Sequence, residues 1–181
     1  MTAQELLRES LKEWFDDVDG FGSGGAGPDV GFDGLSGPDI LRVWEYISTR
    51  SSSISTEPID VQDRDNEGVP DPQPTFAEAV ALVARGELGS VMGSLDGVES
   101  GGVLLPELRL ELGPDMVSMY WWVGTGWCDA EAVAALAELL GELRELVPEA
   151  QLVFEGPDVD EFWGPVNNYV ATTRRVREGL V

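Results

Sequence analysis

Two segments of alternating apolar and polar residues, joined by a short turn, are the strongest constraint on the fold. In residues 104–112, LLPELRLEL, leucines alternate with charged residues, and this period of two is typical of a strand with one buried face. Residues 113–115, Gly-Pro-Asp, predict a turn. Residues 116–123, MVSMYWWV, continue as a second strand. The sequence therefore predicts a β-hairpin.

The register of this hairpin decides which tryptophan is buried. If Glu111 pairs with Met116, one face of the hairpin is apolar and the other is polar. The apolar face then carries Leu108, Leu110, Val117, Met119, Trp121 and Val123. The polar face carries Glu107, Arg109, Glu111, Ser118, Tyr120 and Trp122. We expect Trp121 in the core, whereas Tyr120 and Trp122 are either covered by helices or exposed among carboxylates.

Capping signals predict helices along the rest of the chain. Thr2–Glu5 and Thr75–Glu78 have the spacing of capping boxes. Pro38 suits the first position of a helix, and Asp129 suits an N-cap. The predicted helices cover residues 3–16, 38–50, 76–85, 130–147 and 165–178, and a third strand is predicted for residues 151–154.

Two segments lack the pattern of a regular element. Residues 20–37 are rich in glycine and predict a flexible loop, because ordering glycine costs more backbone entropy than ordering any other residue. Residues 51–74 are acidic and rich in proline, which predicts an irregular surface segment. The chain of 181 residues is expected to form one α+β domain. N-terminal helices and the Gly-rich loop precede a β-β-α-β-α order, in which a mainly antiparallel sheet packs with helices.

The net charge limits the class of partner. The chain has 34 acidic and 11 basic residues, a net charge of −23. Nucleic acid and anionic membranes repel such a surface, so the expected partner is a basic protein. The N-terminal residues lack the pattern of a signal peptide, which favours the cytoplasm. An alternative is an acidic proteome adapted to salt, since Lys12 is the single lysine among the basic residues.

Residue content and motif spacing argue against catalysis and against bound cofactors. The chain has no histidine and one cysteine, so the commonest general base near neutral pH and histidine as a metal ligand are missing. Residues 22–27 have the spacing G-x-G-x-x-G, but no strand precedes them and no helix begins there. Residues 63–68, DRDNEG, resemble the start of a calcium loop, but Pro74 occupies the position of the bidentate glutamate. We expect no enzyme, no cofactor and no metal site.

The candidate partner-binding residues combine carboxylates with aromatic side chains. Five glutamates share one face of the predicted helix 130–147, and like charges four residues apart destabilise a helix. This face is either solvated or a docking surface for a basic partner. Aromatic residues among charges are typical of interface hot spots. The candidates are Tyr120, Trp122, Glu138, Glu142, Glu145 and Asp160.

These features favour a protein that inhibits a basic partner by covering its functional surface. A bacterial toxin's immunity protein is the most concrete case. One alternative is a DNA mimic, whose carboxylates imitate phosphates and block a nucleic-acid-binding protein. A second alternative is a salt-adapted (halophilic) domain with an unidentified ligand.

Overall fold

The computed structural model describes residues 1–15, 29–63, 73–121, 126–127, 129–155 and 158–179. Its helices are α1 (Ala3–Ser10), α2 (Lys12–Phe15), α3 (Gly37–Ser48), α4 (Phe76–Ala84), α5 (Ala130–Leu146) and α6 (Val159–Arg177). Its strands are β1 (Val30–Asp33), β2 (Ser53–Ile54), β3 (Asp60–Gln62), β4 (Ser90–Asp96), β5 (Glu99–Ser100), β6 (Val103–Leu104), β7 (Leu108–Leu112), β8 (Met116–Tyr120) and β9 (Gln151–Phe154). The fold is α+β, and the predicted β-β-α-β-α order is confirmed by β7, β8, α5, β9 and α6.

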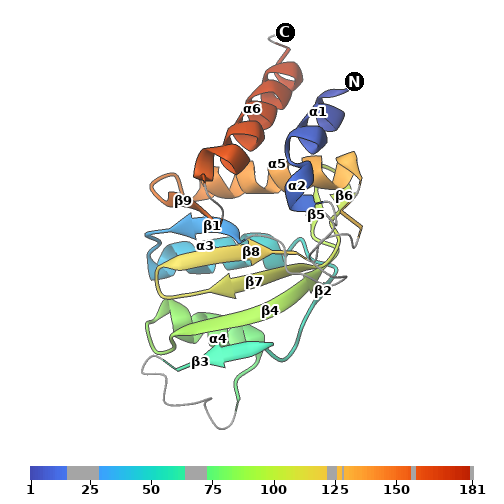
Figure 1. Cartoon of the computed structure of the whole chain (residues 1–181). Coiled ribbons are helices and arrows are strands. Elements are labelled where there is room, and N and C mark those ends of the chain that lie inside the picture. The colour runs from blue at the N-terminus through green and yellow to red at the C-terminus, as the bar shows by residue number, and fades with distance from the viewer. Residues whose placement is uncertain (16–28, 64–72, 122–125, 128, 156–157, 180–181) are drawn as a thin grey trace.

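A seven-stranded antiparallel sheet organises the molecule. Its strand order is β2-β4-β7-β8-β1-β9, and β3 also pairs with β4. Figure 1 shows α3 and α4 behind one face of this sheet, whereas α1, α2, α5 and α6 gather beyond its β1–β9 edge. A separate two-stranded hairpin, β5–β6, contacts α5. None of the described helices combines the length and the apolar character needed to cross a membrane.

The β7–β8 hairpin forms with a register two residues away from the predicted one. Glu111 pairs with Ser118, not with Met116. The backbone N–H of Gly113 donates to the Met116 carbonyl at 2.9 Å, so the turn is tighter than the predicted four-residue loop. Because the shift is an even number of residues, each side chain stays on its predicted face. Leu110, for example, is fully buried.

Trp121 lies in the core, as the alternation predicts. Its side chain is fully buried and stacks on Phe15, with ring centroids 4.8 Å apart and an interplanar angle of 7°. Its indole N–H donates to the Trp14 carbonyl at 3.1 Å. Trp127 and Phe162 extend the same aromatic cluster. This cluster joins the end of β8 to α2 and α6.

The prediction of a loop at residues 20–37 is wrong for residues 30–33. These residues form β1, which pairs with β8 on one side and β9 on the other. Val30 and Phe32 are fully buried, so their burial outweighs the entropic cost of the neighbouring glycines. The part of this segment before Asp29 lies outside the described residues.

The segment 51–74 contains two short strands that composition did not predict. β2 and β3 both pair with β4. β4 was not predicted either, and it lies between the predicted helix 76–85 and the predicted strand 104–112. Residues 64–72 lie outside the described part of the chain.

Helix α6 begins six residues earlier than predicted. The sequence places Pro165 at the first helical position, but the helix begins at Val159 with Asp158 as its N-cap. The Asp158 side chain accepts from the backbone N–H of Asp160 at 2.9 Å. Phe162 and Trp163 are buried in the first turns. Their burial holds this part of the helix although proline removes one helical hydrogen bond.

Candidate functional site

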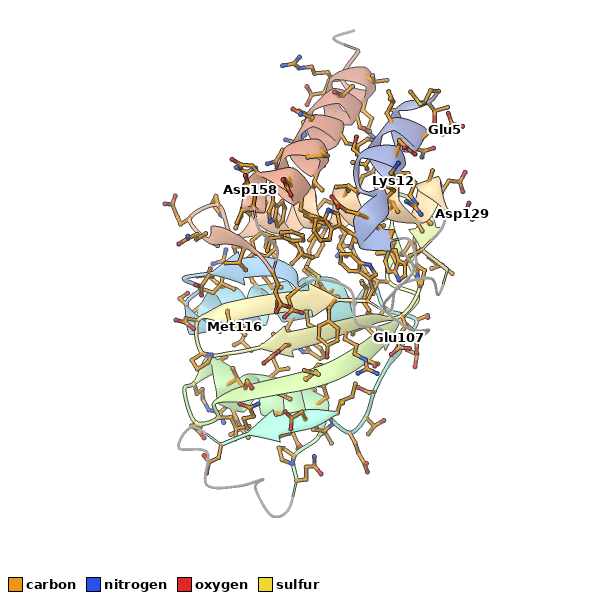
Figure 2. All side chains as sticks on the ribbon, in the orientation of Figure 1. Glu5, Lys12, Glu107, Met116, Asp129 and Asp158 are labelled. Carbon is orange, nitrogen blue, oxygen red and sulfur yellow. The ribbon has the colours of Figure 1, made fainter. Side chains whose placement is uncertain are left out.

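None of the described helices packs on one face of the main sheet. Figure 1 shows this face toward the viewer, with α3 and α4 on the opposite side, and Figure 2 shows Glu107 and Met116 at its two ends. Pairing sets Ser94 beside Arg109 and Arg109 beside Tyr120. The next row runs from Asp60 through Met92, Glu111 and Ser118 to Gly31.

Carboxylates outnumber cations on this face. Directly opposed residues of antiparallel strands share a face, as do residues two positions apart along one strand, and this geometry assigns seven carboxylates to the face. They are Asp29, Asp33, Asp60, Asp96, Glu107, Glu111 and Glu155. Among the described strand residues, Arg109 is the one cation there, and its Nε lies 3.7 Å from Glu107 Oε1. We call this surface the acidic sheet face.

The acidic sheet face raises the pKa of its own carboxyl groups. Burial, together with the negative charges of Glu155 and Glu111, raises the pKa of Asp29 to about 6. Burial also raises the pKa of Glu111, with a smaller contribution from Asp60. Both shifts have the physical cause expected of acids that are partly removed from water beside like charges. The charge of this face is therefore not balanced within the described chain.

Tyr120 lies at the centre of the acidic sheet face but exposes little surface. Its side chain is 8% exposed, and its hydroxyl donates to the sulfur of Met92. The Arg109 guanidinium carbon lies 6.0 Å from the centre of the Tyr120 ring. Burial is the main reason why the pKa of Tyr120 is raised. Tyr120 can therefore contribute only its edge to a partner.

The glutamates of α5 have partners within the protein. Glu138 accepts two hydrogen bonds from the Arg177 guanidinium, both at 2.9 Å. Glu145 forms an ion pair with Arg174. Glu142 accepts a hydrogen bond from the Tyr46 hydroxyl at 2.6 Å. Within α5 itself the one cation is Arg144, and the packing of α6 and α3 against α5 supplies the partners described above.

The two remaining candidates lie apart from the α5 glutamates. Asp160 is exposed at the start of α6. Figure 2 shows the neighbouring Asp158 at the base of α6, beside the β1–β9 edge of the sheet. Trp122 lies outside the described residues.

The sequence patterns did not predict five acids of this face, which are Asp29, Asp33, Asp60, Asp96 and Glu155. Asp29 and Asp33 flank the alternating sequence DVGFD, in which Val30 and Phe32 point to the core. This alternation was a strand signal, but the glycine content of its surroundings concealed it. Asp60 belongs to a strand of three residues, which is too short to carry a period.

Neither motif considered for ligand binding can be placed. The segments 22–27 and 64–68 lie outside the described residues. Across the ranges that are described, no three Asp, Glu or Cys side chains are arranged to hold a metal ion. Comparison with protein-family models, with curated protein sequences and with solved structures finds no match.

Proposed function

We propose that this protein binds a basic partner protein through the acidic sheet face and inhibits that partner by covering its functional surface. The observation that carries the proposal is the excess of seven carboxylates over one arginine on a sheet face that none of the described helices covers. Such a surface attracts a basic partner and speeds association. A bacterial immunity protein that neutralises a toxin in the cytoplasm is the most concrete case.

The acidic sheet face is a better binding surface for a basic partner than the α5 glutamates, for an electrostatic reason. Glu138 and Glu145 are paired with arginines, so a partner would have to compete with cations already present. On the acidic sheet face the pKa values of Asp29 and Glu111 are raised, and a partner's cation would relieve the repulsion that contributes to these shifts.

Two variants of equal charge test the location of the binding surface. The first replaces Glu107, Glu111 and Glu155 with glutamine, and the second replaces Glu138, Glu142 and Glu145 with glutamine. Each removes three negative charges, so general electrostatics affects both equally. The partner is captured from lysate of the source organism at low and moderate salt, identified by mass spectrometry, and its association rate is measured with purified proteins.

We expect the sheet-face variant to associate about tenfold more slowly at low salt, and the α5 variant to associate at nearly the wild-type rate. The reverse result would assign binding to α5. Release of several captured DNA-binding proteins by duplex DNA would favour the DNA mimic. The absence of any specific partner at either salt concentration would contradict both proposals.

A further inference from the structure

A polar cavity is formed by residues other than those of the acidic sheet face. Its volume is about 630 Å³, and it lies where the C-terminal end of α3 meets β5, β6 and α5. This volume is in the range of small-molecule sites. The lining residues that matter to its chemistry are Arg50, Ser51, Ser52, Glu99, Ser100 and Glu142.

The serine hydroxyl groups on the α3 side of the cavity already donate hydrogen bonds to backbone carbonyls of the protein. The Ser51 hydroxyl donates to the Ile47 carbonyl at 3.0 Å, and the Ser52 hydroxyl donates to the Asp96 carbonyl at 2.9 Å. A hydroxyl that donates its one hydrogen elsewhere can only accept further bonds. This side of the cavity therefore offers acceptors to a ligand.

Ser100 gives independent evidence of a missing ligand group. Its side chain is 3% exposed, it lines the cavity, and its Oγ has no hydrogen-bond partner. A buried hydroxyl without a partner costs free energy, which a bound polar group would recover.

The charges around the cavity favour a cation. Glu99 and Glu142 contribute two carboxylates. The one lining arginine, Arg50, is held against α3, with its guanidinium carbon 3.6 Å from the centre of the Tyr46 ring and its Nη1 donating to the Tyr46 carbonyl. The C-terminal end of α3 also carries the negative end of the helix dipole.

We infer that this cavity binds an alkylammonium or alkylguanidinium group, with Glu142 and Glu99 as counter-ions and Ser100 Oγ as an acceptor. The group belongs either to a small diamine or to a lysine or arginine side chain of a protein. Both sources present hydrogen-bond donors on a cation, which is the complement of the acceptors and carboxylates in the cavity. The inference does not depend on the acidic sheet face.

Isothermal titration calorimetry on the full chain tests this site. The probes are 1,4-diaminobutane, the uncharged 1,4-butanediol of the same length, succinate, and the peptide Gly-Arg-Gly. We expect the diamine or the peptide to bind, and we expect the diol and succinate not to bind. The probe with the lower Kd identifies the source of the cation. Binding of succinate, or of none of the four, would overturn the inference.

Three single variants distinguish the cavity from general attraction to an acidic protein. Glu142→Gln should raise the Kd of the cation about tenfold or more, and Ser100→Ala about threefold. Glu149→Gln is the matched control, because it removes one exposed charge three residues beyond the end of α5 without touching the cavity. Its Kd should change less than about twofold. Equal losses in Glu142→Gln and Glu149→Gln would reduce the effect to net charge and overturn the site. The glutamine at position 142 can still accept from Tyr46, so the variant should fold.

Discussion

At the scale of single residues, Gly31 shows how closely the strands of the main sheet approach. A Cβ atom built at this position would lie 2.0 Å from the carbonyl oxygen of Val117, which belongs to the backbone of β8 and cannot rotate away. Position 31 of β1 therefore requires glycine, whereas the glycine content of residues 20–37 predicted a loop. The same residue type has opposite meanings in these two contexts.

Replacing Gly31 with alanine should lower the free energy of unfolding by more than about 3 kcal/mol, because β1 and β8 must separate locally. Gly164→Ala is the control, since a Cβ there meets nothing within 4 Å. Inside α6 this change should stabilise the protein by up to about 1 kcal/mol. Urea denaturation of both variants measures the difference. Equal stabilities would refute the close approach of the two strands.

Asp29 makes the stability of the protein depend on pH. The pKa of its carboxyl group is raised from 3.8 to about 6 in the folded protein. Between these values the folded state binds more protons than the unfolded state, so this group lowers the free energy of unfolding as pH rises from about 4 to about 6. Above that range the loss is complete.

Asp29→Asn should therefore increase the free energy of unfolding at neutral pH by about 1 kcal/mol, because Asp29 is only half-buried and solvent screens much of the roughly 1.4 kcal/mol that corresponds to each pKa unit. Near pH 4 the variant and the wild type should differ much less. Urea denaturation across this range measures the difference, with Asp33→Asn as a control on the same strand. Curves for Asp29→Asn and wild type that stay parallel would show that this carboxyl does not titrate as expected.

At the scale of elements, the contact between α5 and α6 turns a repulsive helix face into a paired one. Like charges four residues apart destabilise α5 when it is considered alone. In the folded protein, Arg177 meets Glu138, whose side chain is only 13% exposed, and this contact raises the pKa of Arg177. The two partners are 39 residues apart in the chain, so no local pattern could reveal them.

Arg177→Gln should lower the free energy of unfolding by about 1 kcal/mol, because it leaves the poorly hydrated Glu138 without its cation. Arg175→Gln is the control, since no carboxylate of the described residues forms an ion pair with Arg175. Thermal melts of both variants in low salt make the comparison. A loss in Arg175→Gln as large as that in Arg177→Gln would mean that only the net charge matters.

At the scale of the whole molecule, the net charge of −23 opposes folding through self-repulsion, while the apolar core favours it. The described core includes side chains from all six helices and from most strands of the main sheet. Ion pairs such as Glu145–Arg174 offset part of the repulsion. These features favour a protein that folds without concentrated salt.

We expect a cooperative thermal melt at about 0.1 M salt, where the Debye length is about 10 Å, and a Tm that rises by a few degrees as salt screens the remaining repulsion. Circular dichroism and calorimetry measure this transition. A chain that unfolds in low salt and folds only in molar salt would support the salt-adapted domain instead.

The sequence by itself determined the elements whose signals are local. Capping boxes at Thr2 and Thr75, the alternation in residues 104–112 and the burial of Trp121 depend on neighbours within a few positions. Where a local rule met a competing tertiary contact, the rule failed. Burial of Phe162 and Trp163 extended α6 past the start set by Pro165.

Tertiary structure decided everything that depends on residues far apart in the chain. It made residues 30–33 an inner strand, because β8 and β9 bury Val30 and Phe32. It placed Asp29 on one face with Glu155 and Glu111, where burial and the repulsion from these two carboxylates raise the pKa of Asp29. It also paired the α5 glutamates with α6. Charge acts through space over several ångströms, whereas sequence patterns report only the neighbours that the chain itself connects.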